Sequence, residues 1–147
     1  MSAPGPIEPH EMVHASCVSL DKIGVLITGA SGQGKSGLAL QLMAFGCDLV
    51  ADDQTQVRRR GSQVLASAPL RISGLIEARG VGLLHAAHQP ETRLHLVIDM
   101  GQREAARLPA EHTRDLLGVE LPCLHKVDSP SFPAAILQYL KCGRAQV

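Results

Sequence analysis

The hydrophobic pattern in the first third of the chain predicts a strand, a helix and a second strand. Residues 23–28 are a continuous apolar run, which is typical of a strand buried on both faces. Residues 34–45 show helical spacing, and Gly46 is a typical residue just beyond a helix end. The apolar positions on this helix are Leu38, Leu42 and Phe45. Residues 48–51 predict the second strand, and this order of elements favours an α/β fold.

Three further elements follow from the pattern of the remaining chain. Residues 57–67 predict a hairpin with Gly61 and Ser62 at its turn. Residues 94–98 are another apolar run and predict another buried strand. Residues 136–140 lie in a predicted terminal helix that packs onto the core. The apolar stripe of this helix consists of Phe132, Ile136, Leu137 and Leu140.

The length of the chain predicts one domain. A chain of 147 residues can build a single hydrophobic core without a disulfide or a metal. The first twelve residues hold three of the nine prolines, so residues 1–12 are predicted to form a flexible arm and residues 13–147 the folded domain. The four cysteines are isolated, no signal sequence is recognisable, and no apolar run reaches about 18 residues. These features predict reduced thiols in a cytoplasmic protein.

The charge balance argues against two classes of partner. The chain has 14 basic and 14 acidic residues, so its formal net charge is zero. A binder of nucleic acid or of anionic membranes normally carries an excess of basic residues. Only three aromatic residues are present, which leaves few platforms for stacking bases. We therefore expect neither a nucleic acid nor a membrane as partner.

The strongest motif is a phosphate-binding loop between the first predicted strand and the first helix. It fits the pattern G-x-x-x-x-G-K-[ST], with a hydrophobic strand before it and a helix after it. Its residues are Gly29, Ala30, Ser31, Gly32, Gln33, Gly34, Lys35 and Ser36. The glycines let successive backbone N–H groups point at an anion next to the helix N-terminus. Lys35 is expected to reach the β- and γ-phosphates, and the Ser36 hydroxyl to occupy a Mg²⁺ position.

A metal-holding carboxylate is needed beside such a loop, and the chain offers several. Asp52 and Asp53 follow the strand predicted at 48–51, whereas Asp99 follows the apolar run at 94–98. Spacing and pattern leave this choice open. Two adjacent carboxylates favour divided labour, in which one supports the metal and the other takes a proton from an attacking hydroxyl.

A carboxylate and a cation also occur together in an apolar segment with glycines. Glu77 and Arg79 stand before Gly80 and Gly82. Phosphoryl transfer needs a carboxylate for Mg²⁺ and a cation for the charge of the transition state. The alternative interpretation is an exposed charged pair at the end of a helix.

Two histidine pairs have spacings that occur in metal sites. His10 and His14 are four residues apart, but the prolines before them argue against a helix and hence against a metal pair. His85 and His88, with Glu91 following, are a better zinc candidate. A polar surface is the favoured interpretation of this second pair.

Taken together, the motifs resemble the catalytic domain of HPr serine kinase/phosphorylase, a bacterial family that acts on the phosphocarrier protein HPr. The resemblance runs from His14 to Val127. Its elements occur in the family's order: His14, the strand and loop ending at Ser36, the acidic pair and the segment 75–82. The resemblance implies a P-loop fold of the phosphoenolpyruvate carboxykinase-like type, in which helices flank a mixed β-sheet.

The resemblance also implies roles for individual residues. The loop is expected to bind the phosphates of ATP, and Ser36 and Glu77 to hold Mg²⁺. Asp53 is expected to accept the serine proton with Asp52 as its support, which favours this pair over Asp99. The other residues expected at the active site are His14, Lys35, Arg79 and Arg107.

By resemblance, the chain is expected to phosphorylate a serine of an HPr-like carrier of a phosphotransferase system and to form a homo-oligomer, a hexamer in the family. The resemblance covers the catalytic domain alone, as in the short form found in alphaproteobacteria. Residues 124–129 lack the arginine and glycine of the family loop tied to dephosphorylation, which makes phosphorylase activity doubtful. Two alternatives stay open, namely a P-loop kinase of a small metabolite and a non-catalytic ATP-sensing module.

Overall fold

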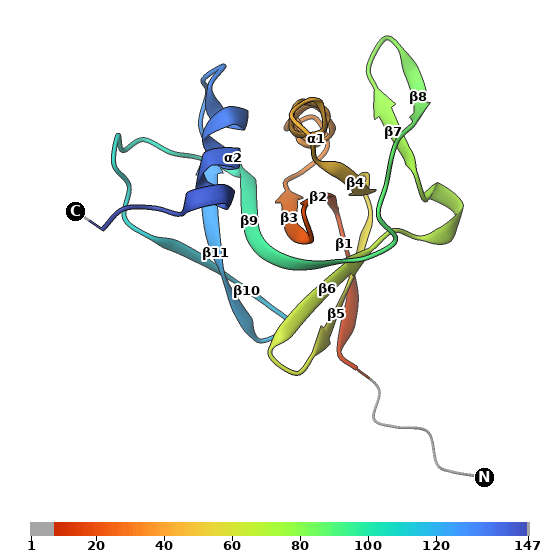
Figure 1. Cartoon of the computed structure of the whole chain (residues 1–147), viewed down its shortest axis with the longest axis horizontal. Coiled ribbons are helices and arrows are strands. Elements are labelled where there is room, and N and C mark those ends of the chain that lie inside the picture. Colours follow the sequence, from red (N-terminus) through yellow and green to blue (C-terminus); the bar gives the residue numbers. More distant parts are fainter. Residues whose placement is uncertain (1–7, 147) are drawn as a thin grey trace.

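The computed structural model describes residues 8–146, which form a curled mixed β-sheet with two helices packed on it (Figure 1). The strands are β1 (His10–Val13), β2 (Ala15–Leu20), β3 (Ile23–Thr28), β4 (Asp48–Ala51), β5 (Thr55–Arg60), β6 (Gln63–Ser67), β7 (Leu75–Ala78), β8 (Gly82–His85), β9 (Thr92–Arg103), β10 (His112–Leu116) and β11 (Val119–Lys126). The helices are α1 (Lys35–Ala44), the 3-10 turn η1 (Leu70–Ile72) and α2 (Phe132–Cys142).

The long strand β9 organises the sheet. The strand order is β1-β5-β6-β9-β3-β2-β4, and β11 pairs with β9 as well as with β10. Strand β9 runs parallel to β3 and to β11, whereas the other pairings within this sheet are antiparallel. Because β9 has twelve residues, its start pairs with β6 and its later part with β11. The hairpin β7–β8 is a separate two-stranded sheet.

Strands β3 and β9 approach one another closely at a glycine. A Cβ atom at Gly24 would lie 2.6 Å from the carbonyl oxygen of Arg93, a distance that no side chain tolerates. Glycine at this position therefore permits the parallel pairing of the two central strands. The loop at the end of β3 depends on this pairing for its place beside β9.

Buried side chains form one cluster on each face of the sheet. The first cluster joins the sheet to α1 and α2 through residues such as Leu42, Leu96 and Ile136. The second fills the concave side, between the central strands and the β5–β6 and β10–β11 hairpins, with residues such as Leu26 and Val97. Leu96 and Ile98 of β9 thus belong to the first cluster and Val97 to the second, which explains why three successive positions of this strand are apolar.

Most predicted elements are confirmed by the structure. The strand at 23–28 has the predicted bounds, and the hairpin, the later central strand and the terminal helix are all present. The helix α1 ends one residue before Phe45, whose side chain is 58% exposed. Phe45, predicted as an apolar position of this helix, therefore lies just beyond the end of the helix.

The flexible arm predicted for residues 1–12 is wrong for its last residues. His10–Val13 forms β1, an edge strand that pairs antiparallel with β5. The reason is tertiary, because the apolar content of this segment is low and the backbone pairing with β5 orders it. Residues 1–7 lie outside the part of the chain that the structure describes. Among residues 8–146, no helix is long and apolar enough to cross a membrane.

Because both faces of β9 are buried, shortening one of its core side chains should destabilise the protein. Leu96 is fully buried in the cluster under α1 and α2, so Leu96→Ala should lower the free energy of unfolding by about 2–5 kcal/mol. The matched control is Leu70→Ala, since Leu70 is 95% exposed and its truncation should change stability by less than about 0.5 kcal/mol. Urea unfolding followed by circular dichroism measures both. Equal stabilities of the two variants would contradict the assigned core.

Candidate functional site

The phosphate-binding loop connects the end of β3 to the start of α1. Its glycines take backbone conformations that other residues avoid, with φ of 85° at Gly32 and 90° at Gly34. Gly34 immediately precedes α1, so the unpaired N–H groups of the first helical turn face the loop. The buried Lys35 donates a hydrogen bond from Nζ to the carbonyl oxygen of Ala30 across the loop, at 3.2 Å. This arrangement holds a cation beside backbone donors and is suited to an anion.

The buried Asp52 connects α1 to strands β2 and β7 by hydrogen bonds. Its Oδ1 accepts hydrogen bonds from the hydroxyls of Ser36, at 2.7 Å, and Ser16, at 2.9 Å. Its Oδ2 accepts the backbone N–H of Glu77 at 3.0 Å. The residue is 8% exposed, and these three donors compensate for its burial. Asp52 therefore connects β2, α1 and β7 at the end of β4.

Asp53 lies at the mouth of the loop. Its φ is 65°, a left-handed conformation that Asp tolerates better than most residues. Two backbone hydrogen bonds fix it, because its N–H donates to Ser16 Oγ and its carbonyl accepts from Ala15 N–H. Its carboxylate Oδ1 lies 2.8 Å from His14 Nε2 and 3.9 Å from Lys35 Nζ. The side chain is 61% exposed, so it is both oriented and accessible.

The β7–β8 hairpin closes one side of a cavity of about 440 Å³ over the loop. Glu77 and Arg79 from this hairpin line the cavity together with Asp53. The remaining lining residues are Ser31, Gly32, Gly34, Lys35, Ser36, Gly37 and Leu40. The alternative that Glu77 and Arg79 form a charged pair at a helix end is wrong, because they belong to a strand and the turn after it.

The competition between the two acidic positions is decided by geometry. The Ser36 hydroxyl binds Asp52. Asp99 instead accepts the N–H of Gly101 at 2.9 Å and lies 3.9 Å from the guanidinium of Arg114. Asp52 is thus the carboxylate in contact with the Ser36 hydroxyl, whereas Asp99 bonds to the backbone of Gly101.

Arg107 is not brought to the cavity. It lies on the exposed loop between β9 and β10 and is not among the residues that line the cavity. In the structure, the other residues predicted for the site, namely His14, Asp52, Asp53, Glu77, Arg79 and the loop, lie together.

One polar residue of the site, Ser16, was not predicted from the sequence, and the contact made by the predicted loop residue Gln33 was not foreseen. Ser16 donates to Asp52 and accepts from the N–H of Asp53, so it sets the relative position of the two carboxylates. Gln33 Oε1 accepts the N–H of Ala30 at 2.6 Å within the loop. Ser16 sits in a buried strand, where a single hydroxyl gives no signal in the sequence; Gln33 occupies a variable position of the motif.

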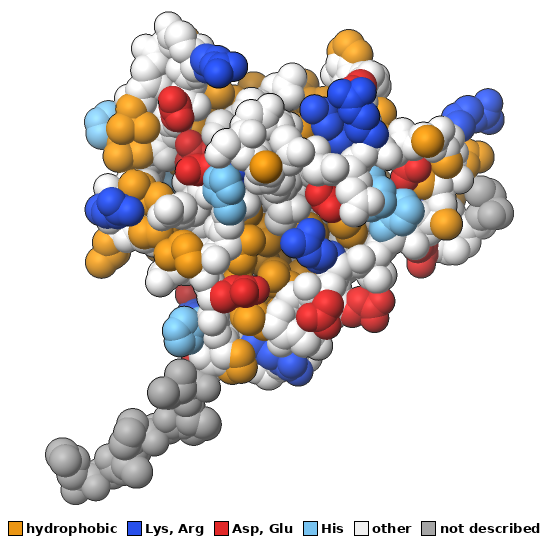
Figure 2. Space-filling model, turned by 180° about the vertical axis from the view of Figure 1, so that it is seen from behind, with side chains coloured by type: hydrophobic (Ala, Val, Ile, Leu, Met, Phe, Trp, Pro, Cys, Tyr) orange, Lys and Arg blue, Asp and Glu red, His pale blue; other side chains and the backbone are white. Residues whose placement is uncertain are grey.

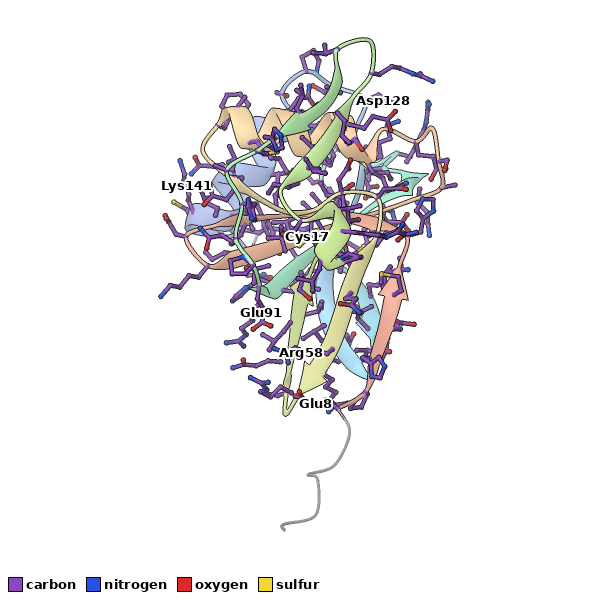
Figure 3. All side chains as sticks on the ribbon, turned by 90° about the vertical axis from the view of Figure 1, so that its right-hand side faces the viewer. Glu8, Cys17, Arg58, Glu91, Asp128 and Lys141 are labelled. Carbon is purple, nitrogen blue, oxygen red and sulfur yellow. The ribbon has the colours of Figure 1, made fainter. Side chains whose placement is uncertain are left out.

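A second cavity of about 390 Å³ lies along α1 next to the loop. The two cavities share Gly34 and Gly37. The other lining residues are Leu38, Gln41, Met100, Lys126, Val127, Asp128, Ser129, Phe132 and Pro133. Asp128 lies at the opposite end of the molecule from Glu8 and Arg58 (Figure 3), so the basic residues of the β5–β6 hairpin are far from this cavity.

The surface charges form no single field on the face seen in Figure 2, where acidic and basic side chains are interspersed. This agrees with the zero net charge of the chain. The electrostatics of the candidate site therefore arise locally, from Lys35, Arg79 and the helix N-terminus on one side and from Asp52, Asp53 and Glu77 on the other.

Comparisons with known proteins identify similar chains. A family profile described as HPr Serine kinase C-terminal domain matches residues 6–126. The HPr kinase/phosphorylase of Geobacillus thermodenitrificans (strain NG80-2) is 38% identical over 131 residues, which cover 80% of this chain and 42% of that protein. The HPr kinase/phosphorylase of Bordetella pertussis (strain Tohama I) is 35% identical over 128 residues, which cover 78% of this chain and 42% of that protein. The chain thus spans less than half the length of these relatives.

A solved structure shares the fold. The HPr(Ser) kinase/phosphatase from Coxiella burnetii superposes with a TM-score of 0.75 and 27% identity, covering 89% of this chain and 94% of that one. The predicted fold class, a P-loop domain with a mixed sheet and flanking helices, is confirmed by this match and by the observed topology.

The hydrogen bonds to Asp52 predict a stability effect. Asp52→Asn replaces one carboxylate oxygen by an NH₂ group that would face the N–H of Glu77 or displace a hydroxyl donor. The variant should lose about 1–3 kcal/mol of unfolding free energy. Asp21→Asn is the control, because Asp21 is exposed and has a positive φ, which Asn tolerates. Chemical unfolding compares the two, and unchanged stability of Asp52→Asn would show that Asp52 is not the centre of this network.

Proposed function

The chain belongs to the family of HPr serine kinase C-terminal domains, and from this premise we propose that it is an ATP-dependent protein-serine kinase acting on an HPr-like phosphocarrier protein. The single observation that carries the proposal is the position of Asp53. Its carboxylate lies at the mouth of the phosphate-binding loop, next to His14 and within 3.9 Å of Lys35. An HPr-like substrate would place the reaction in the cytoplasm.

The loop and its neighbouring cavity are suited to ATP. The backbone N–H groups at 29–36 and the Lys35 ammonium would bind the β- and γ-phosphates, and Lys35 would leave the Ala30 carbonyl to do so. The cavity along α1 shares Gly34 and Gly37 with the loop cavity and has room for the nucleoside. Its lining is partly apolar, through Leu38, Met100 and Phe132, as a base requires.

The oxygen atoms beside the loop fit a magnesium ion. Ser36 contributes a hydroxyl, Asp52 and Glu77 contribute carboxylates, and hard cations prefer such oxygen ligands. We assign Ser36 and Glu77 as the residues that would hold Mg²⁺, with Asp52 orienting the Ser36 hydroxyl. Bound there, Mg²⁺ supplies positive charge that offsets the charge of the phosphate oxygens.

The transfer step follows from the position of Asp53. The serine hydroxyl of the carrier enters the open side of the cavity and its oxygen attacks the γ-phosphorus. Asp53 takes the hydroxyl proton, the bond from the γ-phosphorus to the bridging oxygen breaks, and ADP leaves. His14 orients Asp53 through its 2.8 Å hydrogen bond. Lys35 and Arg79 offset the charge on the transferring group, whereas Arg107, outside the cavity, has no role in this proposal.

An assay of carrier phosphorylation should also test the reverse reaction, dephosphorylation of the carrier. The relatives are named for both kinase and phosphorylase activity, so their names give no support to the expectation that phosphorylase activity is doubtful. The assay should therefore include the phosphorylated carrier with inorganic phosphate as a second arm. Assembly into a homo-oligomer, a hexamer by resemblance, also stays a prediction.

Replacement of the proton acceptor should abolish transfer without abolishing ATP binding. Asp53→Asn keeps the side-chain volume and tolerates the positive φ, yet it cannot take the serine proton. We expect phosphorylation of an HPr-like carrier to slow by about 10²-fold or more, because general-base catalysis contributes about that much. Intact-mass spectrometry of the carrier measures transfer, and calorimetric titration with ATP measures binding.

The control for this variant is Asp21→Asn, because Asp21, like Asp53, is exposed and has a positive φ. It should leave the rate unchanged. Normal turnover of Asp53→Asn would overturn the assignment of the base. Retained ATP binding with no transfer by the unaltered protein to any HPr-like carrier would instead favour an ATP-sensing module.

Removal of the Glu77 carboxylate should raise the Mg²⁺ requirement. Glu77 is exposed on the cavity wall and makes its bond to Asp52 through its backbone N–H, so Glu77→Gln leaves that bond intact. The Mg²⁺ concentration for half-maximal transfer should rise by about tenfold or more. Glu120→Gln, on the exposed side of β11, is the control. Identical Mg²⁺ curves for the two variants would remove Glu77 from the metal site.

A further inference from the structure

A second group of convergent side chains lies outside the nucleotide cavity. Glu104 follows β9, His112 begins β10, and His125 lies near the end of β11. None of the three lines the cavity over the loop. In Figure 1, strands β10 and β11 lie on the opposite side of α1 from the β7–β8 hairpin. The group is the one set of three metal-ligating side chains within the described residues 8–146 whose ligand atoms lie within 4.8 Å of one another.

The three side chains already contact one another. His112 Nε2 lies 2.8 Å from Glu104 Oε1. The rings of His112 and His125 stack with their centroids 3.9 Å apart and their planes 7° apart. All three residues are partly buried, with the Glu104 side chain 13% exposed and that of His112 32% exposed. The group is thus enclosed by protein yet open enough for an ion to enter.

The local backbone holds Glu104 in place. Its N–H donates to the carbonyl oxygen of Lys126, and its second carboxylate oxygen accepts the N–H of Ala106 at 3.1 Å. The pairing of β11 with β9 shifts register between His125 and Lys126, and such irregularities redirect side chains. These hydrogen bonds hold the Glu104 carboxylate in place beside the two imidazoles, as neighbouring groups commonly orient the ligands of a metal site.

The donor atoms of this group are nitrogen and oxygen. One carboxylate oxygen of Glu104 lies 2.8 Å from His112 Nε2, and the other accepts the N–H of Ala106. Cys123 lies opposite His112 in the β10–β11 pairing, but its Sγ donates to the Leu124 carbonyl. The donor set is therefore two imidazoles and one carboxylate without sulfur.

We propose that Glu104, His112 and His125 form a site for a divalent transition-metal cation of borderline softness, such as Zn²⁺. Two nitrogen ligands and one oxygen ligand match Zn²⁺, with a fourth position left for water. Mg²⁺ takes oxygen ligands in octahedral geometry and is not favoured by this set. This site is separate from the Mg²⁺ site of the proposed kinase reaction and does not depend on it.

Binding requires a small rearrangement. A cation cannot lie in the planes of two parallel rings that are 3.9 Å apart, so one imidazole turns about its Cβ–Cγ bond. The partial exposure of His112 leaves room for this turn. The bound ion would join the end of β9, the start of β10 and the end of β11. The ion would thereby link the two ends of the loop at 105–111. It would also restrain the end of β11, which leads into residues 126–129 of the second cavity.

The test is a metal titration of the full chain, freed of metal by a chelator and kept in excess Mg²⁺ so that the oxygen site is occupied. Zn²⁺ is titrated in competition with a chromophoric chelator, and Co²⁺ is added separately because its visible absorption reports nitrogen ligation. We expect one equivalent of Zn²⁺ to bind and the temperature of unfolding to rise. Glu104→Gln and His125→Gln should each weaken Zn²⁺ binding by about tenfold or more.

Two controls separate this site from others. His95→Gln removes a partly buried histidine on β9 whose ring hydrogen-bonds to the nearby Arg93 carbonyl, and it should leave Zn²⁺ affinity unchanged. The double variant His85→Gln and His88→Gln removes the zinc candidate suggested by sequence spacing. Loss of binding in that double variant, no binding by the unaltered chain, or full binding by His125→Gln would each overturn the proposal. Because the His125 ring makes no hydrogen bond within the described residues, His125→Gln should fold normally, which circular dichroism checks.

Discussion

The site depends on one buried carboxylate. Asp52 accepts hydrogen bonds from the hydroxyls of Ser36 and Ser16 and from the N–H of Glu77. This single side chain therefore joins α1, the strand β2 and the β7–β8 hairpin. The carboxylate is almost fully buried, and an unpaired charge there would be costly. All three donors must therefore stay in place. Their positions in turn fix the hairpin over the loop and the hydroxyl that the metal requires.

The position of the proposed base follows from the same constraint. Ser16 bonds to both Asp52 and the N–H of Asp53, and the left-handed backbone at Asp53 turns its side chain outward. One carboxylate of the adjacent pair is thus buried and structural, whereas the other is exposed at the mouth of the loop. This division explains how two neighbouring residues of the same type can take different parts in one reaction.

Much of this arrangement was predictable, and the reason differs from residue to residue. The loop at 29–36 was found because its chemistry requires glycines and a lysine at fixed spacing. The choice between Asp52 and Asp99 could not be made from local pattern, since both follow apolar runs and only strand order decides which one meets Ser36. The resemblance supplied that choice, and the Ser36–Asp52 hydrogen bond confirms their contact.

The missed features depend on contacts between distant segments. Strand β1 is ordered by pairing with β5, more than forty residues later, and its own composition resembles an arm. The segment with Glu77 and Arg79 forms a hairpin on α1 and not a helix end. The residues Glu104, His112 and His125 come from three separate segments, and their spacing in the sequence fits no metal motif, unlike the close spacing of His85 and His88.

The most direct test of the whole account is a crystal structure of the protein with ADP, Mg²⁺ and a planar fluoride mimic of the transferring phosphoryl group. We expect the mimic to lie within hydrogen-bonding distance of Lys35 Nζ, Ser36 and Glu77 to face the metal, and a carboxylate oxygen of Asp53 to face the open side of the mimic. A structure in which the mimic binds elsewhere, or in which the Asp53 carboxylate points away from it into solvent, would contradict the central claim.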